Sequence, residues 1–350
     1  MSLVEFADKA NLDFKSIPII NLEKLRSRNL EDRKALADQV RNACMNVGFF
    51  YVKNHGVPEV NISNVLDRAK EFFDLPMESK MKGGSVFQRK TRANAYALPG
   101  QIENKTTPNF KGYSPLLSGN NDPNNKGDLQ EGFEFGWENL DGVADSSRKD
   151  DGIMTGANVW PSELPDFRAA ALQYYHSLVD LGKLLFPIFA LALNIEENFF
   201  EDKIRNSAAL MRILHYPNQE SSVDDGVLGI GAHTDWECFT ILWQEPGIQA
   251  LQVLNAQKEW INAPPIPGTF VVNLGDQFAR WTNDVFKSTV HRVINKSGAR
   301  RYSIPLFFGT DYDVKLEPIP SCVSTDRPPK YEVVTAGEYV KSRLQATYGH

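Results

Sequence analysis

The feature that most constrains the fold is a series of short apolar segments, separated by turn residues, that occupies the chain after residue 205. The candidate strands are 209–216, 239–243, 250–254, 269–274, 289–294 and 302–308. Many short strands at regular spacing are typical of a double-sheet jelly roll or a barrel. We therefore predict an α+β protein with a double-stranded β-helix (jelly roll) core, braced by N-terminal and central helices.

Helical periodicity dominates the first two hundred residues. Apolar residues recur with helical spacing over 31–47, 62–73 and about 165–194, and short strands are expected at 17–22 and 49–52. We predict that residues 1–130 form an N-terminal scaffold of helices and strands and that residues 131–350 form the jelly-roll core. The two parts together make one catalytic unit.

Charge and composition narrow the classes of partner. The chain has 38 basic and 44 acidic side chains, a net charge of −6, and no basic run, which argues against nucleic acid and for a small molecule. Nothing in the sequence sets the oligomeric state. The three cysteines are scattered, no secretion signal is visible, and no apolar run approaches the length that spans a bilayer. We expect a cytoplasmic protein with no membrane partner.

Three side chains have the identities of a metal site. His233 and Asp235 are one residue apart on an extended segment and so point to the same face. His291 follows 56 residues after Asp235, inside the strand expected at 289–294. Two imidazoles and one carboxylate are the ligands of the facial triad that holds non-haem Fe(II) and leaves positions open.

Other interpretations of these three residues remain open. A His-x-Asp pair can be a surface or turn feature, and a lone histidine in a strand is often a hydrogen-bonded core residue. The same ligands also suit Zn(II), although zinc catalysis usually adds a carboxylate base and the sequence has no HExxH helix to supply one.

Arg301 and Ser303 lie two residues apart in the last expected strand and therefore share a face. A fixed guanidinium and a hydroxyl suit the far carboxylate of a bound keto acid. The alternative is a structural ion pair at the end of the strand.

Several motifs together resemble the iron(II)- and 2-oxoglutarate-dependent oxygenases of the isopenicillin N synthase-like family. The resemblance runs from residue 17 to about residue 308. The motifs are Cys-Met-Asn-Val-Gly-Phe-Phe-Tyr-Val-Lys-Asn-His-Gly-Val-Pro at 44–58, His-Tyr-Pro at 215–217, Gly-Ala-His-Thr-Asp at 231–235, Asn-Leu-Gly-Asp at 273–276, Ser-Thr-Val-His-Arg-Val at 288–293 and Arg-Tyr-Ser at 301–303.

The resemblance implies that His233, Asp235 and His291 hold Fe(II) and that 2-oxoglutarate and O2 are cosubstrates. The implied reaction is hydroxylation, desaturation or oxidative cyclisation of a small molecule, with release of succinate and CO2.

The resemblance also implies a cosubstrate site. The far carboxylate of 2-oxoglutarate would meet Arg301 and Ser303, and Tyr216 would touch it as well. Many members of the family have an asparagine two residues before this tyrosine, where the chain has Leu214. One hydrogen bond to the cosubstrate is therefore missing or supplied elsewhere.

Strand alternation extends the prediction to the substrate. If Tyr216 faces the interior, Arg212 on the same strand does so too and becomes a second interior cation near the iron. The alternative is that Arg212 ends in solvent or pairs with Glu134. At the mouth of the pocket we place Phe133, Phe135, Trp236, Phe307 and the segment 109–113, although aromatic residues at these spacings are often plain core.

Aromatic side chains and one cation in the pocket would suit a compact substrate that bears a carboxylate or another polar acceptor. Two other functions fit the same residues. One is an Fe(II) oxidase or cyclase of this fold that does not use 2-oxoglutarate and holds its own substrate's carboxylate with the Arg-x-Ser pair. The other is a catalytically inactive jelly-roll binding protein.

Overall fold

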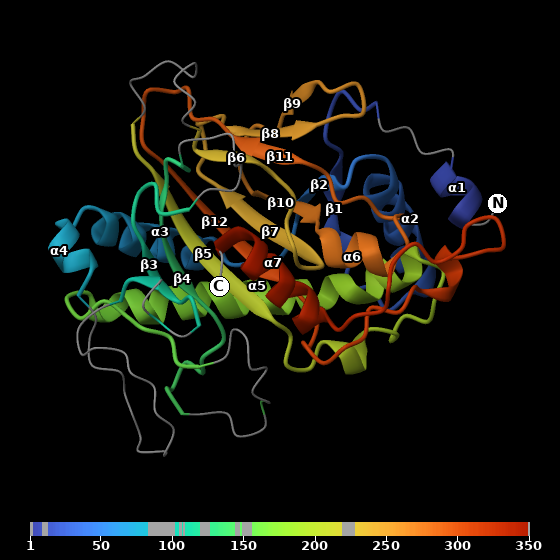
Figure 1. Ribbon diagram of the computed structural model, residues 1–350, viewed down its shortest axis with the longest axis horizontal. Helices are drawn as coiled ribbons and strands as arrows, with labels where there is room; N and C mark the ends of the chain where they lie inside the picture. Colours follow the sequence, from blue (N-terminus) through green and yellow to red (C-terminus); the bar gives the residue numbers. More distant parts are fainter. Residues whose placement is uncertain are drawn as a thin grey trace.

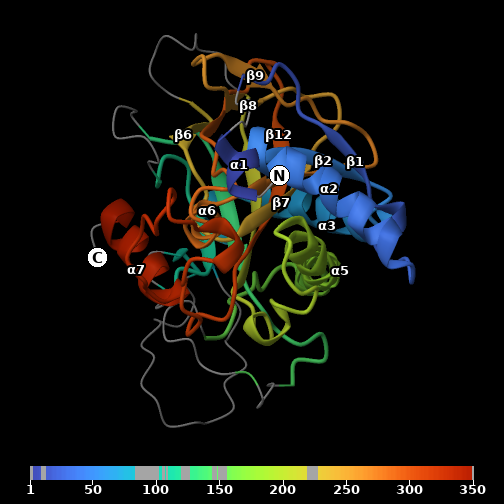
Figure 2. The same cartoon turned by 90° about the vertical axis from the view of Figure 1, so that its right-hand side faces the viewer.

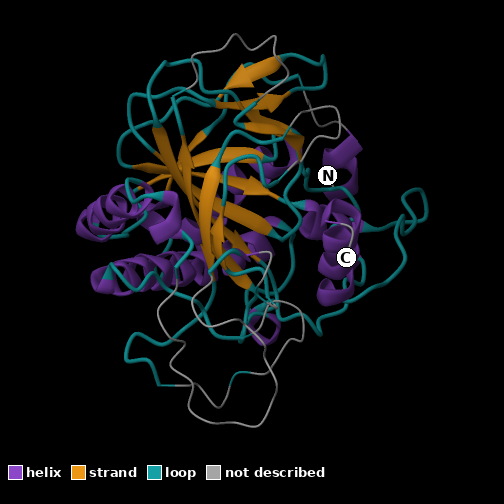
Figure 3. Ribbon diagram, turned by 60° about the vertical axis from the view of Figure 1, so that its left-hand side comes forward, coloured by secondary structure: helices purple, strands orange, loops and turns teal. Residues whose placement is uncertain are grey.

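The computed structural model describes residues 3–8, 13–82, 102–104, 107, 109–119, 127–143, 148, 156–218 and 228–348. In this part of the chain the strands form two sheets at the centre, and long helices flank the larger one (Figures 1 and 3). The arrangement confirms the predicted α+β fold, with a double-stranded β-helix core and bracing helices.

Among the described residues, the larger sheet has eight strands in the order β1-β2-β10-β7-β12-β5-β4-β3. Neighbouring strands are antiparallel, except β1 and β2, which are parallel. The strands are Ile19–Asn21 (β1), Phe49–Lys53 (β2), Gly112–Ser114 (β3), Glu131–Phe135 (β4), Ala209–Tyr216 (β5), Phe239–Gln244 (β7), Thr269–Leu274 (β10) and Arg301–Phe308 (β12).

The smaller sheet has the order β6-β11-β8-β9. Its strands are Ile230–His233 (β6), Leu251–Leu254 (β8), Trp260–Asn262 (β9) and His291–Val293 (β11). All six strands predicted after residue 205 are present, with ends that differ by no more than two residues. The prediction missed β3, β4 and β9, and it described the region of β6 only as an extended segment that carries His233 and Asp235.

The helices are α1 (Leu3–Asp8), α2 (Leu30–Asn46), α3 (Glu59–Phe73), α4 (Met77–Lys80), α5 (Pro165–Ala192), α6 (Asp276–Trp281) and α7 (Ala336–Tyr348). Helices α2 and α3 pack on α5, which runs along the larger sheet (Figures 1 and 2). A Cβ at Gly182 of α5 would lie 2.4 Å from the ring of Phe308, so glycine is what allows α5 to approach β12 this closely.

Helix α5 is long and apolar enough to cross a membrane by length and composition alone, whereas we expected no such run. In the structure 61% of its most apolar window is buried inside the protein. Its Tyr174, Leu178 and Phe186 are fully buried in the main core. The helix is thus the central core helix of this fold.

The proposed division at residue 130 does not coincide with a break in the sheet. Strands β1, β2 and β3 precede it, yet β2 pairs with β10 and β3 pairs with β4. The two parts of the chain share one sheet, and the division itself stays a prediction.

Candidate active site

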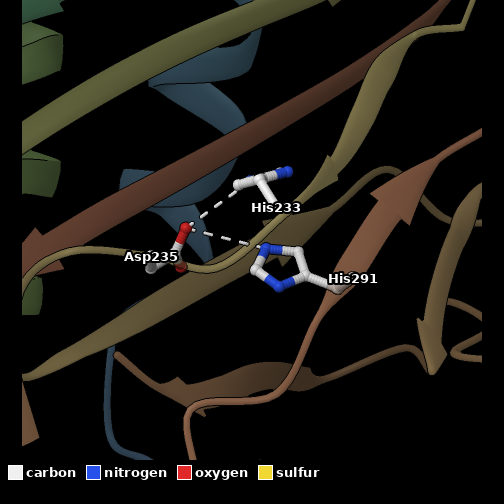
Figure 4. Close-up of side chains that lie close together, drawn as sticks. All are labelled: His233, Asp235 and His291. Carbon is white, nitrogen blue, oxygen red and sulfur yellow. Dashed lines mark ion pairs between the residues drawn. The ribbon is translucent and has the colours of Figure 1, made fainter. Parts of the chain in front are cut away.

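His233, Asp235 and His291 converge at one edge of the smaller sheet. His233 ends β6, Asp235 follows in the next loop, and His291 begins β11. The Nε2 atoms of His233 and His291 lie 3.7 Å and 3.6 Å from Oδ1 of Asp235 (Figure 4). One ligand atom from each residue lies within 4.8 Å of the others, so the three side chains can hold one metal ion.

Both imidazoles are oriented through their second nitrogen. Nδ1 of His233 lies 2.8 Å from the carbonyl oxygen of Gly231, and Nδ1 of His291 lies 3.1 Å from that of Thr289. Donation from Nδ1 leaves the lone pair on Nε2, the atom that faces Asp235. Burial, followed by the neighbouring His233, lowers the pKa of His291 to about 4, so this ring is neutral at physiological pH.

Asp235 is held by two side chains to which the sequence analysis gave no role in the site. Thr240 Oγ1 and Asn273 Nδ2 donate to Asp235 Oδ2 over 2.5 Å and 2.7 Å. Burial alone would raise the pKa of this carboxyl, but His291, His233 and these two hydrogen bonds lower it. Because Oδ2 is engaged, Oδ1 is the oxygen that can bind a metal. The available signal was Asn273 itself, a polar side chain in an otherwise apolar strand.

Arg301 is almost completely buried, with 1% of its surface exposed. Its Nη2 donates to Gln244 Oε1 over 3.2 Å, while Nε and Nη1 have no partner among the described residues. The guanidinium lies 4.9 Å from the ring centroid of Tyr216, its register partner on β5. Burial lowers the pKa of Arg301. A buried guanidinium with open donors needs an acceptor, so these residues fit the far carboxylate of a keto acid.

A cavity of about 170 Å³ joins these two groups of residues. Trp236, Phe307 and Ser303 line it as predicted, together with Phe110 from the segment 109–113. Leu214 also lines it, two positions before Tyr216 on β5. Sequence reasoning missed Val340 and Leu344 of the C-terminal helix α7, because a helix with few apolar residues carries no mark of the site that it covers.

Arg212 lines the cavity, as strand alternation predicted, but it is paired. Its Nε lies 2.8 Å from Oε1 of Glu134, which lines the same cavity from β4. The alternative of an ion pair with Glu134 is therefore the correct one. The second interior cation is therefore present but not isolated, because the register of β4 places Glu134 directly opposite Arg212.

The placement of Phe133 and Phe135 at the mouth of the pocket was wrong. Both are fully buried and pack on the opposite side of the sheet, against Phe167 and Tyr175 of α5 and against Trp160. Alternation explains the error, since Glu134 faces the cavity and its two neighbours must face the helices. Tyr113 is also core, where it packs on Phe72.

Two stretches of the chain match known families. Residues 17–163 match the N-terminal region of non-haem dioxygenases in morphine synthesis, and residues 207–310 match the 2OG-Fe(II) oxygenase superfamily. The 2-oxoglutarate-Fe(II) type oxidoreductase hxnY of Emericella nidulans is 36% identical over 338 residues, which cover 95% of this chain and 90% of the relative.

Further relatives are similar over most of their length. Homoarginine-6-hydroxylase 2-ODD-C23 of Glycine max is 34% identical and covers 88% of this chain and 89% of its own. The crystal structure of a full-length Neurospora crassa protein in complex with alpha-KG and thymine has a TM-score of 0.78 at 27% identity and covers 99% of both chains.

The jelly-roll core and the two-histidine, one-carboxylate group define the class of non-haem iron oxygenases. Within that class, the chain belongs to the 2OG-Fe(II) oxygenase superfamily. It is an enzyme that uses Fe(II) and 2-oxoglutarate to oxidise small molecules.

Proposed function

We propose that His233, Asp235 and His291 are the protein ligands of the Fe(II). The observation that carries this assignment is the convergence of their two Nε2 atoms and one carboxylate oxygen within 4.8 Å. The hydrogen bonds on the far side of each ring and on Oδ2 of Asp235 support it, since such contacts fix the direction of metal ligands. Three protein ligands leave the remaining positions to 2-oxoglutarate and O2.

Arg301 is proposed to bind the far carboxylate of 2-oxoglutarate, with help from Ser303 and Tyr216. Its unpartnered Nε and Nη1 atoms support this role, and so does the burial of Ser303, which is 2% exposed. A guanidinium can donate two parallel hydrogen bonds to a carboxylate, which sets the orientation of the cosubstrate as well as its affinity. Gln244 accepts a hydrogen bond from Nη2 of the same guanidinium.

Iron, once bound, supplies the oxidising chemistry, in which 2-oxoglutarate is converted to succinate and CO2. The chain contributes position and exclusion of water. The apolar side chains of Leu214, Leu242 and Phe307 keep the cavity dry, and the polar groups determine which C–H bond lies next to the metal. The choice among hydroxylation, desaturation and cyclisation depends on that placement.

We propose that the substrate is a small molecule whose apolar body contacts Phe307 and Trp236 and whose polar group meets Arg212. These residues line the same cavity as the metal group. The relatives named for homoarginine and crystallised with thymine are consistent with a compact polar substrate.

Oxygen consumption and succinate formation test this function in the full-length protein. We expect both to require Fe(II) and 2-oxoglutarate and to increase with a true substrate, for which thymine and homoarginine are the first probes. Oxygen consumption without succinate would favour an iron oxidase that does not use 2-oxoglutarate. No oxygen consumption at all would favour a binding protein.

A further inference from the structure

The substrate side of the cavity contains an ion pair rather than an isolated cation. Glu134 and Arg212 are register partners on β4 and β5, and Arg212 Nε lies 2.8 Å from Glu134 Oε1. Both side chains line the cavity, with exposed fractions of 9% for Glu134 and 19% for Arg212. The pair therefore places a hydrogen-bond donor and an acceptor side by side.

Asn104 adds a second hydrogen-bond acceptor next to this ion pair. Its Nδ2 donates to Ser114 Oγ over 2.7 Å and to Glu134 Oε2 over 3.1 Å, which determines how the amide is oriented. Its Oδ1 is buried and has no partner among the described residues, although Asn104 lines the cavity. A buried carbonyl oxygen without a donor is costly, and an N–H group of a ligand would remove that cost.

The charge of the cavity argues against an anionic substrate. In the described part of the chain, the acidic side chains that line the cavity are Glu134, Asp235 and Glu237, and the basic ones are Arg212 and Arg301, which gives a formal charge of −1. Fe(II) and 2-oxoglutarate carry equal and opposite charges, so loading the site does not change this balance. A second carboxylate would be desolvated beside Glu134 with no unneutralised cation to receive it.

We propose that Arg212, Glu134 and Asn104 recognise an uncharged amide-type group of the substrate, such as an amide, lactam, imide or ureide. The C=O accepts from Arg212, and the adjacent N–H donates to Glu134 or to Asn104 Oδ1. Glu134 neutralises Arg212 and so rejects carboxylates. This assignment rests on the proposed function, because it takes the cavity as the substrate site, and it replaces the carboxylate that the sequence suggested.

Benzamide, benzoate and benzamidine test the assignment, since they share a ring and differ only in the group presented. Binding is measured by ligand-observed NMR and calorimetry on full-length protein loaded with Mn(II), to prevent turnover, and saturated with 2-oxoglutarate, to occupy Arg301. Benzamide should bind at least about tenfold more tightly than benzoate, whose charge Glu134 repels, the effect of one charge-assisted hydrogen bond. It should also bind at least about tenfold more tightly than benzamidine, because an amidinium has no acceptor for Arg212 and would place a second positive charge beside it. Equal affinities, no binding of any probe, or tighter binding of either ion would overturn the proposal.

Glu134→Gln provides a readout that a purely structural role would not give. Without the carboxylate, Arg212 is no longer neutralised, so the preference should shift from benzamide to benzoate. An unchanged preference in the folded variant contradicts the role of Glu134. Glu78→Gln is the matched control, because Glu78 is exposed on α4, pairs with Lys82 and does not line the cavity.

Asn104→Ala serves as a second variant if Glu134→Gln does not fold. It should weaken benzamide binding about tenfold and leave 2-oxoglutarate affinity unchanged. Unchanged benzamide affinity would contradict the role of Asn104 in binding the amide group. Failure of the underlying function would look different, because 2-oxoglutarate itself would then fail to bind before any probe is added.

Discussion

His233 and His291 are directly opposite each other in the antiparallel pairing of β6 with β11, and their ring centroids are 4.3 Å apart. Two residues that are 58 positions apart in the chain are thus paired across neighbouring strands. Asp235 completes the group from the loop that follows β6. The strand pairing therefore fixes the positions of the two histidines relative to each other.

Replacement of either histidine should remove the metal. His233→Ala and His291→Ala should bind Mn(II) too weakly to measure by calorimetry and should form no succinate, since a three-ligand site has no spare ligand. His176→Ala is the control, because His176 lies on α5, where its Nε2 contacts the carbonyl oxygen of Glu138. Normal turnover by either site variant would contradict the ligand assignment.

Arg301→Ala should raise the KM for 2-oxoglutarate by about tenfold to a hundredfold, as expected for the loss of a charge-assisted contact. Arg301→Lys should restore only part of the affinity for 2-oxoglutarate, because an ammonium cannot donate two parallel hydrogen bonds to a carboxylate. Arg300→Ala is a neighbouring control, since Arg300 is half exposed and pairs with Asp74. Steady-state kinetics with 2-oxoglutarate as the varied substrate measure all three. Similar KM values in wild type and Arg301→Ala would show that Arg301 does not bind 2-oxoglutarate.

Asn273→Ala should weaken metal binding about tenfold to a hundredfold without abolishing it, because Asp235 loses one of the hydrogen bonds that orient it. The metal affinity of Asn262→Ala should be unchanged, since Asn262 is exposed on β9. Calorimetric titration with Mn(II) makes the comparison. An effect of equal size in both variants would indicate a general loss of stability instead.

Phe133→Ala should mainly lower the stability of the protein, whereas Phe307→Ala should mainly weaken substrate binding. Phe133 is fully buried against α5, so its truncation should cost about 3–5 kcal/mol of unfolding free energy. Phe307 lines the cavity, so its truncation should mainly weaken substrate binding. Urea unfolding and substrate titration on both variants separate the two roles. Normal stability of the Phe133→Ala protein would contradict the assignment of Phe133 to the core.

Leu344→Ala should raise the KM for the substrate while the KM for 2-oxoglutarate stays near the wild-type value. Leu344 lines the cavity from α7, and the next residue, Gln345, is exposed. Gln345→Ala is therefore the control on the same helix. If Leu344→Ala instead altered only the KM for 2-oxoglutarate, α7 would belong to the cosubstrate side.

Alternation within single strands was readable from the sequence. It put Arg301 with Ser303 and Tyr216 with Arg212, because successive side chains of a strand point to opposite sides whatever the strand pairs with. The prediction that His233 and Asp235 lie together also holds, although Asp235 follows the end of β6. Strand spacing after residue 205 also indicated the fold class, since many short strands can bury their apolar faces only in a closed or double sheet.

Relations between strands were decided by the tertiary structure. The sequence does not encode the register of β4 against β5 in a readable way, so it could not decide whether Arg212 pairs with Glu134. The contacts of Thr240 and Asn273 with Asp235, and of α7 with the cavity, likewise join segments that are separate in the chain. Register is a property of two strands at once, and a shift of one residue would exchange every inward side chain for an outward one.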